Sequence, residues 1–95
     1  MKHYYVYILA SKKDGVLYIG FTNDLSRRIQ EHKTKATKGF TSKYHIKRLV
    51  YYEQFENSSN AFVRERQLKK WKRIWKIELF ENENPEWNDL SKDWE

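Results

Sequence analysis

A short N-terminal hairpin is the feature that most constrains the fold of this chain. Residues 4–10, Tyr-Tyr-Val-Tyr-Ile-Leu-Ala, are β-branched, aliphatic or aromatic and are typical of a strand. Asp14-Gly15 favours a tight turn because this pair tolerates positive φ, and Val16 to Gly20 is expected to return as a second strand. Residues two apart share a face of a strand, which groups Tyr5, Tyr7 and Leu9 on the first and Val16, Tyr18 and Gly20 on the second.

The remaining sequence alternates helix and strand signals. Leu25, Ile29 and His32 recur at helical spacing and predict a helix over 24–33. Residues 34–46 are polar and are expected to form a loop, and Asn84-Pro85 is expected to start a short turn or helix. A third strand is predicted over 48–55, with helices over about 60–71 and 73–81. The order β-β-α-β-α-α predicts an α+β fold, a small three-stranded antiparallel sheet flanked by helices, in one domain over residues 1–95.

Composition excludes several classes of protein and suggests a partner. The 95 residues include no cysteine, so neither disulfides nor a thiolate zinc site can stabilise the domain. No stretch approaches the roughly 20 apolar residues of a membrane span, and the start lacks a signal-peptide pattern. We therefore expect a cytoplasmic protein, most simply a monomer.

Charge is distributed unevenly along the chain. Residues 1–48 hold eleven Lys or Arg against three acids, and residues 81–95 hold one against six. A basic body favours a polyanionic partner such as nucleic acid, although a basic solvated surface explains the same charge. The acidic tail, from about residue 82, can either fold back over basic surface or hang free.

Two side chains are candidates for chemistry. Glu65 falls on a helical line with Ala61, Leu68 and Trp71 that is otherwise apolar. A carboxylate there needs a cation, a metal or hydrogen-bond donors, and a structural ion pair with Arg or Lys would satisfy it equally. Arg28 lies at the margin of the first helix, where its guanidinium could grip a phosphate with two parallel hydrogen bonds.

These positions resemble a known family. Tyr5-Val6-Tyr7, then Tyr18-Ile19-Gly20 about ten residues later, then Asn23-Asp24-Leu25 with Arg27-Arg28, are similar to the motifs of the GIY-YIG nuclease superfamily. The chain most resembles its small standalone bacterial members. The resemblance extends through Arg64-Glu65 and the tail Asn84-Pro85-Glu86-Trp87, and so covers nearly the whole chain. The first motif reads Tyr-Val-Tyr in place of Gly-Ile-Tyr, but it retains the terminal tyrosine as Tyr7.

The resemblance implies a metal-dependent endonuclease that hydrolyses phosphodiester bonds in nucleic acid, with DNA favoured over RNA and with selection by substrate shape. Glu65 would bind one Mg²⁺ or Mn²⁺ ion. Tyr7 and Tyr18 would line the attacking water, with Tyr18 as the group that deprotonates it, and Arg28 would stabilise charge on the phosphate. Lesser roles would fall to His32 as a phosphate or proton-transfer group, to Asn84 rather than Asn82 as the late asparagine, and to Gly20 as a structural residue.

The same resemblance places flanking nucleic-acid backbone on the basic loop, at Lys33, Lys35, Lys38 and Lys43. We expect Tyr7, Tyr18, Arg28 and Glu65 to meet in one pocket open to solvent. Two alternatives remain open. The chain could be a non-catalytic nucleic-acid-binding module that keeps the fold. It could also be an interaction protein whose tryptophans, Trp75, Trp87 and Trp94 among them, serve an interface.

Overall fold

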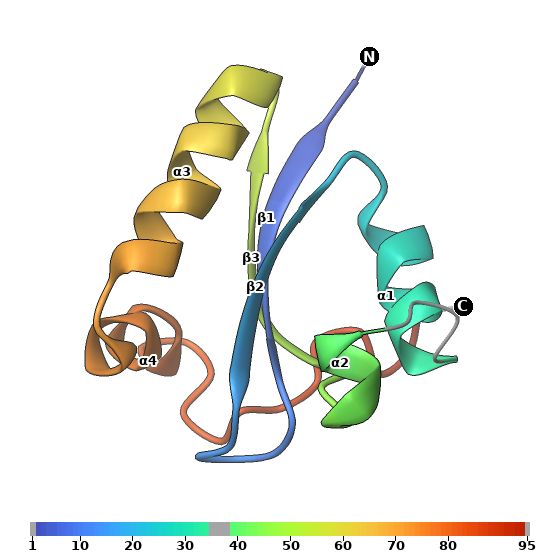
Figure 1. The fold of residues 1–95 in the computed structure, drawn as a ribbon, viewed down its shortest axis with the longest axis vertical. Coiled ribbons are helices and arrows are strands. Elements are labelled where there is room, and N and C mark those ends of the chain that lie inside the picture. Colours follow the sequence, from blue (N-terminus) through green and yellow to red (C-terminus); the bar gives the residue numbers. More distant parts are fainter. Residues whose placement is uncertain (1, 35–38, 95) are drawn as a thin grey trace.

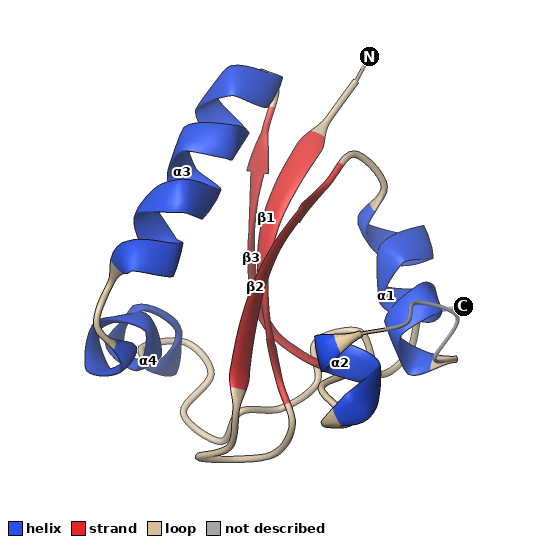
Figure 2. Cartoon of the chain, in the orientation of Figure 1, coloured by secondary structure: helices blue, strands red, loops and turns tan. Residues whose placement is uncertain are grey.

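The computed structural model describes residues 2–34 and 39–94, which form one three-stranded antiparallel sheet with helices on both faces (Figures 1 and 2). Its strands are β1 (Tyr4–Ala10), β2 (Leu17–Thr22) and β3 (Arg48–Phe55), in the order β2-β1-β3. The hairpin strand β1 is therefore central, and β2 is an edge strand. This arrangement confirms the predicted α+β fold and antiparallel sheet.

The helices divide between the two faces of the sheet. Helices α1 (Leu25–Lys33) and α2 (Phe40–Lys43) lie on one side, and α3 (Ser58–Lys70) and α4 (Arg73–Glu81) lie on the other (Figure 1). Side chains define two of the starts, since Asp24 accepts a hydrogen bond from the backbone N–H of Arg27 and Asn57 accepts from Ser59 and Asn60. Because Asn57 is the cap, α3 begins two residues before its predicted start.

The expectation of a continuous loop over residues 34–46 was wrong for α2. This helix has only four residues, begins after Gly39 at a φ of 117°, and buries Thr41. One turn of helix is too short to show an apolar period, and it is held by contacts with the rest of the fold. It matters for function because it carries Thr41 to the candidate site.

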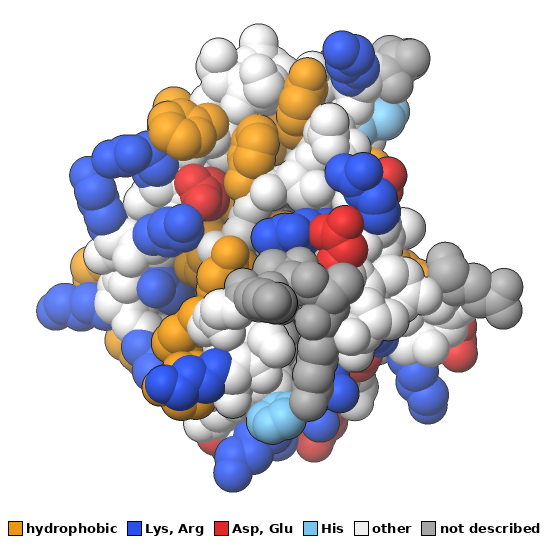
Figure 3. Space-filling model, turned by 45° about the vertical axis from the view of Figure 1, so that its right-hand side comes forward, with side chains coloured by type: hydrophobic (Ala, Val, Ile, Leu, Met, Phe, Trp, Pro, Cys, Tyr) orange, Lys and Arg blue, Asp and Glu red, His pale blue; other side chains and the backbone are white. Residues whose placement is uncertain are grey.

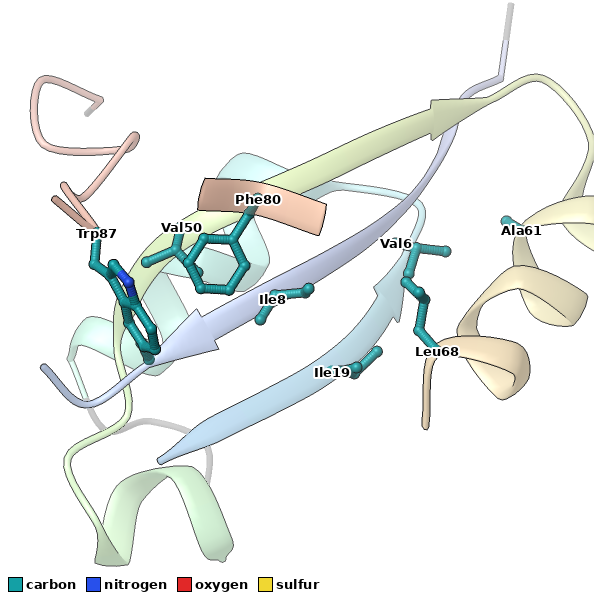
Figure 4. Close-up of a cluster of buried hydrophobic side chains, with 9 residues drawn as sticks. Val6, Ile8, Ile19, Val50, Ala61, Leu68, Phe80 and Trp87 are labelled. Atoms are coloured by element: carbon teal, nitrogen blue, oxygen red, sulfur yellow. The ribbon is translucent and has the colours of Figure 1, made fainter. Parts of the chain in front are cut away.

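The larger core lies between the sheet and the α3–α4 layer. Figure 4 shows Val6, Ile8 and Ile19 of the sheet packed near Ala61 and Leu68 of α3, with Phe80 and Trp87 at the other end. These side chains are at most 4% exposed. A second cluster on the opposite face joins Tyr7 to five aliphatic residues, namely Leu9, Leu25, Ile29, Ile46 and Leu49.

The acidic tail folds back onto the domain. Trp87 is fully buried at a φ of 57°, and its indole N–H donates to Glu81 at 2.6 Å. Asp89 then accepts hydrogen bonds from Lys33 and from the backbone N–H of Leu49. The tail therefore runs from the α4 face towards the α1 face and covers one end of the sheet. Within the described ranges, no helix combines the length and apolar character needed to cross a membrane.

Candidate active site

Tyr7 and Gly20 form the centre of the candidate site because strand pairing places them opposite one another. A Cβ atom on Gly20 would lie 2.2 Å from Cζ and 2.3 Å from Oη of Tyr7, far inside van der Waals contact. The absence of a side chain on Gly20 therefore makes room for the Tyr7 phenol. Burial raises the pKa of Tyr7 to about 12, although a hydrogen bond from Arg28 opposes this rise. Tyr7 is therefore a protonated phenol at neutral pH.

His32 connects the Tyr7 phenol to α2. Its Nε2 lies 3.2 Å from Tyr7 Oη, and its Nδ1 lies 2.9 Å from Thr41 Oγ1. Burial and the nearby charge of Arg28 lower the pKa of His32 to about 4, so its ring is neutral at neutral pH. A neutral imidazole carries one N–H, so in the row Tyr7–His32–Thr41 one ring nitrogen donates a hydrogen bond and the other accepts one. Sequence reasoning missed Thr41, because nothing local marks it as a partner of His32.

Arg28 and Tyr18 complete this cluster at the solvent boundary. Arg28 Nη1 donates to Glu31 Oε1 at 2.9 Å, and its hydrogen bond with Tyr7 raises the pKa of the guanidinium further. The ring of Tyr18 lies 6.4 Å from that of Tyr7 and 5.8 Å from that of His32. Tyr18 is half-buried, whereas Tyr7 is 1% exposed. The structure thus brings Tyr7, Tyr18, Arg28 and His32 together on the α1 face of β2.

Glu65 approaches the sheet from the other face. Ala61 and Leu68 are fully buried on α3, and Arg64 makes a two-pronged ion pair with Glu53 of β3. Glu65 lies on the opposite flank of the helix from Arg64, towards the edge strand β2. The tyrosine cluster and this carboxylate therefore lie on the two sides of β2, and the expectation of one shared pocket remains a prediction.

Glu65 has a lysine as its cationic partner, which is the structural ion pair that the sequence left open. Its side chain is 13% exposed and its Oε2 pairs with Lys69 Nζ at 2.7 Å. Among residues 2–34 and 39–94, no three His, Cys, Asp or Glu side chains gather in a way that could hold a metal. A single carboxylate fits Mg²⁺, which keeps most of its waters and often uses only one or two protein carboxylates. An ion there would compete with Lys69 for the carboxylate.

Asn84 lies outside the tyrosine cluster. Its Nδ2 donates to the carbonyls of Val50 and Asn88, and its Oδ1 accepts from the backbone N–H of Asn88. These hydrogen bonds brace the tail against β3 and use both ends of the amide. A catalytic role for Asn84 has no supporting contact here and remains a prediction.

The predicted backbone-binding lysines have mixed positions. Lys33 Nζ lies 2.7 Å from Asp89 Oδ2, so its charge is already compensated. Lys43 stands 5.5 Å from the centre of the Tyr44 ring, on the surface of α2. Lys35 and Lys38 lie outside the described residues.

The fold and the candidate residues define a GIY-YIG type of catalytic domain. Its β-hairpin carries two tyrosines, one helix adds an arginine, and a second helix adds a glutamate. A family model described as the GIY-YIG catalytic domain matches residues 3–78. The chain therefore belongs to the GIY-YIG family of nucleic-acid endonucleases.

Known relatives are of similar size. The chain is 40% identical over 80 residues to a UPF0213 protein of Clostridium perfringens, which covers 84% of this chain and 85% of that protein. It is 35% identical over 79 residues to a UPF0213 protein of Staphylococcus saprophyticus, covering 83% and 95% of the two chains. The solution NMR structure of a UPF0213 protein from Bacillus halodurans is 31% identical, with a TM-score of 0.56 over 96% of this chain and 97% of that one.

Proposed function

We propose that this protein is a metal-dependent endonuclease that hydrolyses phosphodiester bonds, with DNA as its first candidate substrate. One observation carries the proposal. The Tyr7 phenol is fixed over Gly20, between Arg28 and His32 and beside the half-exposed Tyr18. This arrangement offers a guanidinium for a phosphate, a fixed phenol and a solvent-accessible phenol at the margin of one edge strand.

The two tyrosines receive different roles because their surroundings differ. Tyr7 is buried and has a pKa of about 12, so it acts as a hydrogen-bond donor that orients the water or the phosphate. Tyr18 is half-buried and within reach of solvent, so it is the group that, in its phenolate form, would accept the proton of the attacking water and become a neutral phenol. Arg28 holds a phosphate oxygen and stabilises the negative charge that builds up there.

Glu65 would hold the divalent cation, Mg²⁺ or Mn²⁺, on the other side of β2. When bound, this ion would polarise a phosphate oxygen and stabilise the leaving 3′ oxygen. Lys69 lies beside the carboxylate and, once displaced by the ion, is free to contact the phosphate. The scissile group would then lie across the edge strand, between Arg28 and Glu65.

The decisive experiment measures cleavage by purified protein of single-stranded, duplex and branched DNA and of RNA, with Mg²⁺, with Mn²⁺ and with chelator. Glu65→Gln and Tyr18→Phe are expected to lower the cleavage rate at least about 100-fold while remaining folded. Glu78→Gln, which neutralises an exposed glutamate of α4, serves as the matched control and should cut like the parent.

Two outcomes would refute the proposal. Either no substrate is cut under any metal condition, or the Glu65 variant cuts as fast as the parent. Tight, metal-independent binding without turnover would instead support a non-catalytic nucleic-acid-binding module. Activity is therefore measured together with binding on every substrate.

A further inference from the structure

The α3–α4 layer has an excess of positive charge. Residues 58–76 include seven Lys or Arg and a single acid, Glu65. That difference equals the net charge of +6 for the whole chain. Residues 1–57 are also basic, with eleven Lys or Arg against five acids, and residues 77–95 are acidic, with one against seven. Residues 58–76 are therefore one of two basic segments and have the fewest acids for their number of cations.

Ion pairing neutralises some cations on each face, and on α3 Arg64 pairs with Glu53 and Lys69 pairs with Glu65. On the α1 side, Arg27 and Arg28 pair with acids of their own helix, and Lys33 pairs with Asp89. On the α3 side, exposed Arg66 and Lys70 have no carboxylate partner within the part of the chain that the structure describes. Unpaired cations that share one face attract a polyanion more strongly than neutralised ones do.

These unpaired cations border the candidate catalytic carboxylate. A shallow groove on α3 is lined by Phe62, Glu65, Arg66, Lys69 and Lys70. Space filling shows Lys and Arg side chains gathered on the side of the molecule that carries α3 and α4, with hydrophobic side chains between them (Figure 3). A backbone seated in this groove would pass directly beside Glu65.

We propose that the exposed face of α3 and the start of α4, centred on Arg66 and Lys70, is the surface that binds the polynucleotide backbone flanking the scissile phosphate. The proposal rests on the proposed nuclease function, because the position of the scissile phosphate beside Glu65 decides where the flanking nucleic-acid strand continues. It replaces the residues from Lys33, at the end of α1, to Lys43, at the end of α2, as the principal contact for flanking nucleic acid.

Exposed aromatic rings on the same helices support a nucleic-acid partner. Phe62 is 49% exposed with the guanidinium of Arg66 5.5 Å from its ring centre, and Trp75 is 47% exposed with Lys72 at the same distance. Each pair offers a cation for a phosphate and an apolar surface for a sugar or base. An acidic protein partner would use the same cations, so the experiment must separate the two.

The test compares two double variants that lower the net charge equally. Arg66→Gln/Lys70→Gln removes the two unpaired cations of α3, and Lys43→Gln/Lys47→Gln removes two exposed cations beside the loop. Binding of fluorescein-labelled oligonucleotides, single-stranded and duplex, is measured by anisotropy across a salt series with chelator present. We expect the affinity of Arg66→Gln/Lys70→Gln to fall about ten-fold, and the slope of log affinity against log salt concentration to become less steep by about two. The affinity of Lys43→Gln/Lys47→Gln should stay within about two-fold of the parent.

Equal losses in the two variants, or a larger loss in the loop variant, would overturn the proposal. So would the absence of affinity for either nucleic acid at low salt, which would point to a protein partner. Because the assay contains no metal, it is independent of catalysis. If the α3 variant alone loses affinity but the parent protein cuts no substrate, the binding surface is supported and the nuclease function is refuted. If the parent protein cuts nucleic acid but the α3 variant keeps its affinity, the nuclease function is supported and the binding surface is refuted.

Discussion

Gly20→Ala tests whether the candidate site depends on the space above one glycine. The added Cβ would lie 2.2 Å from Cζ of Tyr7, whereas carbon atoms in contact prefer about 3.5–4.0 Å. The phenol must therefore move by at least about 1.3 Å, which breaks its 3.2 Å contact with His32 Nε2. Because Tyr7 is 1% exposed, neighbouring side chains resist this movement.

The expected loss of stability follows from three opposing contributions. Overpacking of a buried site costs about 1–3 kcal/mol, and loss of a buried hydrogen bond costs about 1 kcal/mol. Replacing glycine in a strand returns about 0.5–1 kcal/mol, because the unfolded chain has less freedom to lose. We expect Gly20→Ala to lower the free energy of unfolding by about 1–3 kcal/mol and the melting temperature by roughly 5–20 °C.

Urea unfolding and thermal melts measure this loss, and a double-mutant cycle assigns it to Tyr7. Tyr7→Leu removes Cε1, Cζ and Oη, the three atoms that the new Cβ meets. In that background, Gly20→Ala should be nearly neutral, which gives a coupling free energy of about 1–3 kcal/mol. The same cost in both backgrounds would show that the glycine serves backbone conformation, and the steric argument would fail.

Two further predictions concern protonation and the tail. The pKa of His32 is about 4 when folded and near its ordinary value of about 6.5 when unfolded, so the free energy of unfolding should fall as pH decreases from about 6.5 to about 4, by about 3 kcal/mol. His32→Gln should lose this component in urea titrations at several pH values, and an unchanged pH profile would contradict the assignment. Asp89→Asn weakens the ion pair with Lys33 and should lower the free energy of unfolding by about 1–2 kcal/mol. Asp93→Asn, an exposed change of equal charge, should stay within about 0.5 kcal/mol of the parent, and equal losses would contradict the specific role of Asp89.

The sheet and the long helices were accessible to sequence analysis because each has a local signal. Aromatic and β-branched residues predicted β1 and β3 with their observed bounds. Period-2 spacing correctly placed Tyr5 and Tyr7 on one shared face, which the structure shows packed against α1. Helix α2 could not be predicted in the same way, because four residues carry no period. The position of Trp87, buried at positive φ, depends on where the tail returns across the finished sheet.

The candidate site likewise has residues that the sequence could predict and residues that it could not. The resemblance predicted that Tyr7, Tyr18, Arg28 and Glu65 share one pocket. The structure brings Tyr7, Tyr18 and Arg28 together with His32, because they share one hairpin face and one adjacent helix, and the inclusion of Glu65 stays a prediction. Thr41 could not be assigned, because its contact with His32 spans nine residues and depends on α2. An ion pair was one of the two expectations for Glu65, and the structure shows it with Lys69, four residues away on the same helix. The pair between Lys33 and Asp89 could not be predicted, because it depends on the folded tail.

A site that spans an edge strand explains why these groups need not share one pocket. In the middle of the sheet, neighbouring strands would separate groups on opposite faces, but beyond β2 there is no further strand. In the proposed arrangement, Arg28 would reach a phosphate at this edge from the α1 face and Glu65 would reach it from the α3 face. Two compensated or neutral groups, Tyr7 and His32, then remain buried on one face, while the carboxylate and the unpaired cations lie together on the other. In the proposed arrangement, the side of the edge strand that carries Glu65, the proposed metal ligand, is also the side that would attract the polyanion.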